Sequence, residues 1–179
     1  MKRLVHRAAV LAAALAVAGC SRRGSTGTPE PVASGTLRNA AGERVGVATI
    51  RDTAGIAELG ISVSGLAPGP HGLHFHAQGT CTAPEFTSAG PHLDPGGRKH
   101  GRLNPDGPHR GDLPNLIVGA EGSADTSFAL ARELASGGPG ALLQPGGTSL
   151  VIHADPDDER TDPSGNSGAR VACAVLEPG

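Results

Sequence analysis

The stretch PHGLHFH, residues 70–76, carries a His-x-His pair inside an apolar segment. Alternate residues of a β-strand point to the same face, so His74 and His76 project together, about 6.5–7 Å apart along the backbone. Leu73 and Phe75 then point the opposite way, into a core. Two imidazoles at this spacing can converge on one metal ion, although most isolated His-x-His pairs are solvated or core histidines.

The first nineteen residues are typical of an export signal. Lys2, Arg3 and Arg7 form a positive n-region, and the apolar run 8–18 is too short to span a bilayer. Residues 17–20 read VAGC, which resembles the bacterial lipobox, in which the cysteine is lipidated and becomes the new N-terminus. Cys20 is therefore the expected site of a lipid anchor, with a flexible tether over residues 20–34. An ordinary cleaved signal with an unrelated cysteine is the alternative.

Without the signal, the charge balance is acidic. Removing Lys2, Arg3 and Arg7 from 15 basic residues leaves 12 against 17 acidic residues, a formal net charge of −5. The chain has neither a basic stripe nor interleaved aromatic residues, so no nucleic-acid partner is expected. Cys81 and Cys173 remain as a pair once Cys20 is set aside. In an exported protein such a pair is by default a disulfide, and the alternative is two free thiols in a cytosolic protein.

Short apolar runs separated by Gly, Asn, Pro and Asp predict an all-β domain, a sandwich or a barrel, over residues 35–179. Strands are expected at residues 44–50, 59–63, 71–76, 116–118, 124–130, 150–153 and 169–176, and turns at 39–42 and 53–55. Residues 77–112 have no apolar period, and a loop of that length inside a compact domain needs something to organise it.

Histidines supply a candidate organiser. The seven that remain after the signal all lie between residues 71 and 153, and several flank or fill the long loop. Three histidines and a carboxylate from one loop suit a closed tetrahedral zinc site. An all-imidazole set with an open position suits copper.

Six motifs, in order, resemble those of the copper/zinc superoxide dismutase family over roughly residues 35–177. They are HGLHFH (71–76), SAGPH (88–92), KHG (99–101), HRGDL (109–113), LVIH (150–153) and GARVAC (168–173). The resemblance implies a Greek-key β-sandwich or flattened eight-stranded barrel with two long functional loops. It also implies two cofactors: copper held by His74, His76, His92 and His153, and zinc held by His92, His100, His109 and Asp112.

The same resemblance implies disproportionation of superoxide to O₂ and H₂O₂, with His92 bridging the metals and carrying a proton. Arg170 would dock the anionic substrate. Asp157 would link a copper histidine to a zinc histidine, unless it is a solvated loop acid. His71 would be a structural hydrogen-bonding residue, and Cys81 would pair with Cys173.

Two segments depart from the family pattern. The loop 154–169 is short, lacks lysine and has five acidic residues against one arginine. Attraction of an anion is therefore expected to come from the metals and from Arg170, with basic residues of the long loop, which we call the metal loop, as further candidates: Arg98, Lys99, Arg102 and Arg110. The segment from Cys81 to His92 is longer than in the family and carries TAPEFT at residues 82–87.

Other functions remain open at this point. A non-catalytic copper- or zinc-binding envelope lipoprotein on the same scaffold is the main alternative, and a zinc hydrolase is a weaker one. The sequence favours an exported protein, lipid-anchored in a bacterial cell envelope, and leaves monomer and homodimer equally open.

Overall fold

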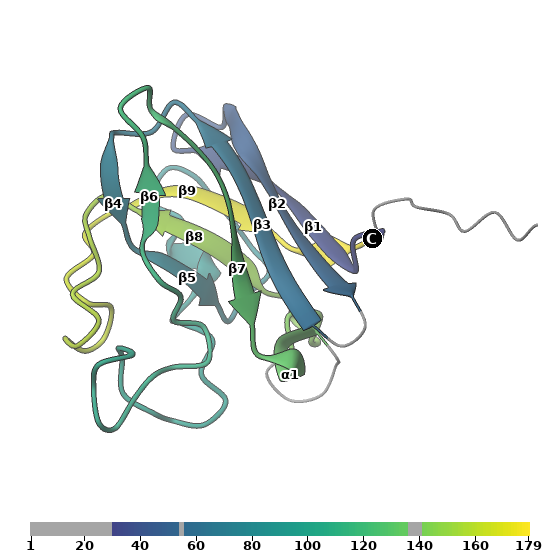
Figure 1. Cartoon of the computed structure of the whole chain (residues 1–179), viewed down its shortest axis with the longest axis vertical. Coiled ribbons are helices and arrows are strands. Elements are labelled where there is room, and N and C mark those ends of the chain that lie inside the picture. The colour runs from purple at the N-terminus through teal and green to yellow at the C-terminus, as the bar shows by residue number, and fades with distance from the viewer. Residues whose placement is uncertain (1–29, 54–55, 136–140) are drawn as a thin grey trace, which may run out of the picture.

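The computed structural model describes residues 30–53, 56–135 and 141–179. Ten strands are described, with one short α-helix and one 3₁₀ helix (Figure 1). The strands are β1 Ala33–Asn39, β2 Arg44–Thr53, β3 Ile56–Ser64, β4 Gly69–His71, β5 Leu73–His76, β6 Leu116–Val118, β7 Ser123–Leu130, β8 Ser149–His153, β9 Arg170–Val175 and β10 Glu177–Pro178. The helices are η1 Thr87–Ala89 and α1 Arg132–Ala135.

All strand pairs are antiparallel. The large sheet has the order β5-β8-β9-β1-β2-β3-β7, with β10 also paired to β1, and β4 and β6 form a separate pair. The large sheet curls so that β1, β2, β3 and β7 face the layer formed by β4, β5, β6, β8 and β9 (Figure 1). The predicted all-β sandwich or flattened barrel is therefore confirmed.

The core is built from small aliphatic residues, as the composition requires. In β3, every second residue from Ala57 to Val63 is buried, which confirms the strand expected at residues 59–63 and shows that one of its faces packs on the core. In β5, Leu73 and Phe75 belong to the main core cluster and are fully buried. The intervening His74 and His76 are also fully buried, although they point to the other face, because the two long loops cover them.

Main-chain hydrogen bonds attach the long loop of residues 77–115 to the edge of β5 that pairs with no other strand. Phe75 exchanges bonds with Gly111 and Leu93 at 2.8–2.9 Å, and Leu113 bonds to the carbonyl of Leu73 at 3.3 Å. Leu93 and Leu113 are buried in the main core. This loop is therefore organised in part by sheet-like pairing, a contribution that its Gly- and Pro-rich sequence did not indicate.

The N-terminal boundary of the domain lies two residues earlier than predicted. β1 starts at Ala33, which is buried and pairs with Ile50, so Ala33 and Ser34 belong to the sheet and not to the tether. The predicted signal, Cys20 and most of the tether lie outside the described residues, as does part of the turn at 53–55. No helix in the described part of the chain is long and apolar enough to cross a membrane.

A disulfide joins Cys81 in the long loop to Cys173 in β9, with the two Cα atoms 5.7 Å apart. The predicted pairing is thus present. The two cysteines are 92 residues apart in the sequence, and the segment that the bridge closes includes β6, β7, β8 and most of both long loops.

We expect reduction of this disulfide to lower the free energy of unfolding by about 4–5 kcal/mol, because a closed segment of about ninety residues strongly restricts the unfolded chain. Urea unfolding with and without reductant measures the difference, with the Cys81→Ser, Cys173→Ser double variant as the control for reductant effects. Two thiols titrating in the native, unreduced protein would contradict the pairing.

Candidate metal centre

Four buried histidines from two strands and a loop converge beside β5. His74 and His76 belong to β5, His153 ends β8, and His92 belongs to the 77–115 loop. Each offers a ring nitrogen, and these four atoms lie within 4.8 Å of one another. We refer to these residues as the four-histidine group.

Each histidine of this group leaves one buried nitrogen without a hydrogen-bond partner in the described structure: Nδ1 of His74, and Nε2 of His76, His92 and His153. The second nitrogen of each ring contacts Asp157, the Gly90 carbonyl, Asp112 and the Gly168 carbonyl, respectively, at 2.8–3.2 Å. Such outer contacts orient metal-binding imidazoles and turn the free lone pairs inward. Since buried nitrogens are costly to leave unpaired, the group fits a metal ion, and four imidazoles suit copper.

A second group lies on the other side of His92. The Nδ1 atoms of His92, His100 and His109 lie 2.9, 3.1 and 3.3 Å from Oδ1 of Asp112. The Nδ1 atoms of His92 and His109 are 3.3 Å apart. Zinc ligands at about 2.0–2.1 Å in a tetrahedron are separated by about 3.3 Å. We call these four residues the His₃Asp group, and they have the composition and spacing of a closed zinc site.

His74 lies close to both groups, since it also offers a nitrogen within 4.8 Å of donors from His92, His100 and Asp112. We place it in the four-histidine group because its Nδ1 is one of the unpartnered nitrogens and its Nε2 is bonded to Asp157. His109, with 11% of its side chain exposed, completes the His₃Asp group from the outside.

Asp157 connects the two groups. Its Oδ2 accepts a hydrogen bond from His74 Nε2 at 2.8 Å, and its Oδ1 accepts one from His100 Nε2 at 3.0 Å. Asn115 holds the main chain of Asp157 through two bonds of 2.8 Å. A buried carboxylate with these partners is not a solvated loop acid. His71 stays outside both groups, with its ring nitrogens 2.7 Å from the carbonyls of His153 and Ala67.

Burial determines the protonation of three members of the four-histidine group, His76, His92 and His153. It lowers the pKa of His76 to about 2, of His153 to about 3 and of His92 to about 4. In His92 a hydrogen bond to Asp112 opposes this effect without cancelling it. These rings are therefore neutral at neutral pH, which is the state that binds metal ions.

The His₃Asp group behaves differently. Burial alone would lower the pKa of His100, but its hydrogen bonds to Asp112 and Asp157 and their charges raise the pKa to about 9. Burial would raise the pKa of Asp112, yet bonds from His100, His92 and the Gly101 amide hold it well below its usual range. In the metal-free protein, a proton on His100 thus balances the two carboxylates, and a metal ion at Nδ1 has to displace a proton.

A cavity of about 500 Å³ opens onto the four-histidine group. Its walls include His76, His92, His153, Arg170, Asp94 and Ser164. Arg170 is half-buried, and burial lowers the pKa of its guanidinium, which nevertheless stays charged at neutral pH. A second cavity of about 890 Å³ is larger and mostly apolar, and its walls include Leu66 and Val171. None of the four histidines with an unpartnered nitrogen lines it, so the smaller cavity gives access to the four-histidine group.

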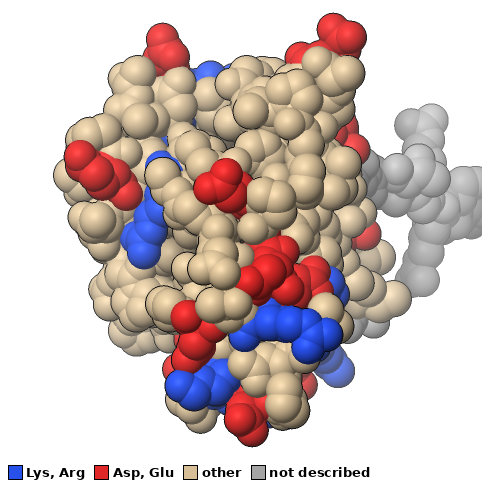
Figure 2. All heavy atoms as spheres, turned by 90° about the vertical axis from the view of Figure 1, so that its left-hand side faces the viewer, with Lys and Arg blue, Asp and Glu red and all other residues tan. Residues whose placement is uncertain are grey.

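Ion pairs join the metal loop to the 154–169 loop. Lys99 Nζ lies 2.7 Å from Asp162 Oδ2, and Arg102 Nη2 lies 2.6 Å from Glu159 Oε1. Figure 2 shows acidic and basic side chains close together in the lower half of this face. Lys99 and Arg102 were expected to help attract an anion, but each is paired with a carboxylate that offsets its charge. Attraction of an anion to the cavity therefore depends more on Arg170, which lines it.

Sequence reasoning missed several residues that shape the site. Asn115 gave no signal, because a polar residue just before a strand is common in turns. The carbonyls of Gly90 and Gly168 orient His76 and His153, and backbone acceptors leave no trace in a side-chain pattern. Asp94 lines the cavity, and its carboxylate accepts the amide of Arg98 at 2.6 Å.

Comparison with known proteins gives a consistent result. The family described as copper/zinc superoxide dismutase matches residues 44–176. A superoxide dismutase [Cu-Zn] of Caulobacter vibrioides is 40% identical over 148 residues, which are 81% of this chain and 85% of that protein. One from Aquifex aeolicus is 40% identical over 142 residues, 78% of this chain and 83% of that protein.

Solved structures show the same likeness. The crystal structure of a superoxide dismutase-like protein from Bacillus subtilis has a TM-score of 0.75 at 38% identity, covering 80% of this chain and 97% of that one. The Cu/Zn superoxide dismutase from Brucella abortus has a TM-score of 0.63 at 29% identity, covering 80% and 98%.

An antiparallel β-sandwich with two adjoining histidine-rich metal groups defines a class of metalloenzyme. The chain belongs to the copper/zinc superoxide dismutase family: it is a superoxide dismutase, and its cofactors are copper and zinc.

The lowered pKa values predict acid sensitivity in the metal-free protein. The unfolded chain protonates these histidines near pH 6.5, whereas the folded state keeps His76, His92 and His153 neutral down to about pH 2–4. Folding stability should therefore fall as pH drops below 6.5, with about two to three protons taken up on unfolding near pH 5. Urea unfolding of chelator-treated protein between pH 7 and 4.5 measures the slope. A stability independent of pH over this range would contradict the burial of neutral rings.

Proposed function

We propose that the chain disproportionates superoxide at a copper ion held by the four-histidine group and bridged through His92 to a zinc ion held by the His₃Asp group. The observation that carries this proposal is the orientation of His92. Its Nε2 is one of the four unpartnered nitrogens, while its Nδ1 lies 2.9 Å from Asp112 in the other group. A single ring thus presents one nitrogen to each site.

Copper, when bound, supplies one-electron chemistry between Cu(II) and Cu(I), so that two superoxide ions and two protons give O₂ and H₂O₂. To serve both sites, His92 has to give up its second N–H proton, which is favourable only between two dications. With a proton on Nε2, His92 would present to the cavity a donor whose proton could pass to the reduced substrate, while Nδ1 would remain at the His₃Asp group beside Asp112.

Asp157 fixes the orientation of the four-histidine group relative to the His₃Asp group. Because its two oxygens hold Nε2 of His74 and Nε2 of His100, neither ring can turn independently of the other. The buried carboxylate also strengthens both histidines as ligands, in the manner of outer carboxylates at other metal sites.

Arg170 docks the anionic substrate. Its guanidinium lines the cavity together with His76, His92 and His153. A superoxide ion there meets a fixed positive charge in a partly desolvated space, where salt screens the attraction poorly.

A non-catalytic metal-binding protein on the same scaffold is supported less well. Such a protein has no need of a charged arginine beside an open site. Here all seven proposed ligand residues and Arg170 lie together around one cavity and its adjoining group.

We also propose that the protein works outside the cytoplasm, lipid-anchored to a bacterial envelope membrane through Cys20. The Cys81–Cys173 disulfide supports an oxidising compartment. The anchor itself rests on the lipobox-like sequence at residues 17–20, and a lipidated cysteine that carries two or more acyl chains gives stable membrane attachment.

The His92→Ala variant should lose dismutation and disturb both metal sites together, because it removes a ligand from each. Metal analysis and the Cu(II) spectrum of the purified variant measure this. His71→Ala is the control, because His71 is a buried histidine that belongs to neither group. Full zinc occupancy with an unchanged Cu(II) spectrum in His92→Ala would rule out the bridge.

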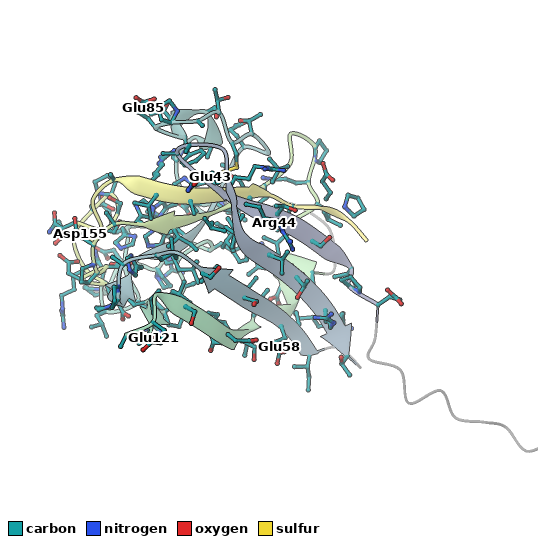
Figure 3. All side chains as sticks on the ribbon, turned by 90° about the horizontal axis from the view of Figure 1, so that it is seen from above. Glu43, Arg44, Glu58, Glu85, Glu121 and Asp155 are labelled. Atoms are coloured by element: carbon teal, nitrogen blue, oxygen red, sulfur yellow. A yellow bond between two sulfur atoms is a disulfide. The ribbon has the colours of Figure 1, made fainter. Side chains whose placement is uncertain are left out.

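The Arg170→Glu variant should lower kcat/KM by tenfold or more, about 1.4 kcal/mol upward in activation free energy, with copper and zinc both retained. Arg44→Glu makes the same change of charge on β2, away from the loop edge marked by Asp155 (Figure 3), and should alter the rate far less. Pulse radiolysis or a coupled superoxide assay decides between them. A rate for Arg170→Glu within a factor of two of wild type would make Arg170 a structural residue.

A further inference from the structure

Two backbone carbonyls hold the guanidinium of Arg170. Nη1 donates to the carbonyl of Phe86 at 2.6 Å, and Nη2 donates to that of Gly90 at 2.7 Å. The Gly90 carbonyl also accepts a bond from Nδ1 of His76, so one oxygen orients both the arginine and a proposed copper ligand. The position of Arg170 therefore depends on the conformation of residues 86–90.

Both carbonyls belong to residues with a positive φ. Gly90 has a φ of 74°, which glycine adopts freely, and Phe86 has a φ of 53° and a ψ of 24°. A bulky residue in the left-handed region is a true exception and persists only where the surroundings enforce it. Something must hold Phe86 there.

The side chain of Phe86 supplies that restraint. It is 1% exposed and forms a small apolar cluster with Ala89, Val151 and Cys173, against which Cys81 packs. The preceding Glu85 is exposed and points outward at the rim of the molecule (Figure 3). The segment TAPEFT thus turns one apolar side chain inward, over the disulfide, and directs the carbonyl of the same residue to Arg170.

The disulfide and the Arg170–Phe86 hydrogen bond tie β9 to the segment 81–86 at two points. Arg170 and Cys173 lie on the same strand, β9, and Cys81 begins the segment that carries Phe86. The disulfide makes the connection at one end of the segment, and the bond from Arg170 to the Phe86 carbonyl makes it at the other. The side chain of Phe86 packs in the apolar cluster that contains Cys173 and contacts Cys81, at the disulfide end.

We infer that Phe86 is a positioning residue for Arg170: its buried side chain, wedged against the disulfide, fixes a left-handed backbone whose carbonyl holds the guanidinium in the cavity. This inference rests on the proposed docking role of Arg170. Phe86 touches neither the metal groups nor the substrate, and it acts through the orientation of the arginine.

Chemical modification of Arg170 tests the inference without relying on catalysis. In the metal-loaded protein, phenylglyoxal should modify Arg170 slowly, because two of its nitrogens are bonded and the side chain is half-buried. The Phe86→Ala variant should accelerate modification of Arg170 by about tenfold, measured by peptide mass spectrometry with exposed Arg44 as the internal reference. Phe128→Ala is the matched control, since Phe128 is a half-buried phenylalanine that packs on the main core from β7.

The Phe86→Gly variant separates the side chain from the backbone. Glycine adopts a φ of 53° without strain, so this variant keeps the backbone conformation available and removes only the restraint. Accelerated modification of Arg170 in both Phe86→Gly and Phe86→Ala supports the inference. Slow modification in Phe86→Gly, within twofold of wild type, would show that backbone conformation alone suffices and would overturn the role of the side chain.

Binding of azide, followed by the Cu(II) absorption spectrum, provides the second readout. We expect the azide dissociation constant to rise about five- to tenfold in Phe86→Ala, with copper and zinc content unchanged, and to be unaffected in Phe128→Ala. If Phe86→Ala fails to fold, Phe86→Leu, which keeps an apolar side chain of smaller size, should show intermediate values in both measurements. Wild-type values in Phe86→Leu and Phe86→Gly would refute the inference.

The two proposals can fail separately. If Arg170→Glu leaves both azide affinity and turnover unchanged, Arg170 does not dock anions. The rate of its modification in the Phe86 variants still decides whether Phe86 holds it.

Discussion

Four buried imidazole nitrogens that lack a protein partner impose the main constraint on this structure. Buried polar atoms of this kind oppose folding unless something pairs with them. The core cannot offset the cost generously, because most of it is aliphatic and the whole chain has three phenylalanines and neither tryptophan nor tyrosine. When these atoms bind a metal ion, they contribute folding free energy instead of opposing folding. Metal binding therefore helps to order the loops that supply the ligands.

The strand β5 makes this arrangement possible within four residues. Leu73 and Phe75 pack into the main core, and His74 and His76, which alternate with them along the strand, face the metal groups. Because the two sets alternate along one backbone, a shift of the strand by a single residue would exchange core residues with ligands. The positions of two proposed copper ligands are therefore set by the packing of the aliphatic core, which lies on the opposite face of the sheet.

Side-chain patterns in the sequence were sufficient for much of the fold, whereas the proposed members of both metal groups were implied by the resemblance of six motifs to the copper/zinc superoxide dismutase family. The alternation in β3, the strand β6 and the His-x-His pair were all readable, since each depends on the residues themselves. By contrast, β1 was not predicted, because ASGTLRN buries only Ala33 and Leu37 and shows no clear alternation. The loop–loop ion pairs and the carbonyls that hold Arg170 depend on residues brought together by the whole fold.

The attachment of the metal loop to β5 has a consequence for what happens when the loop comes away. β5 is the terminal strand of the large sheet, and residues 93, 111 and 113 of the loop occupy the main-chain groups along its free side. A terminal strand with open donors and acceptors is a template for pairing with another chain. The metal loop therefore also acts as a cap against self-association. If the loop detaches, the main-chain groups along this edge of β5 become available for pairing with a second copy of the chain.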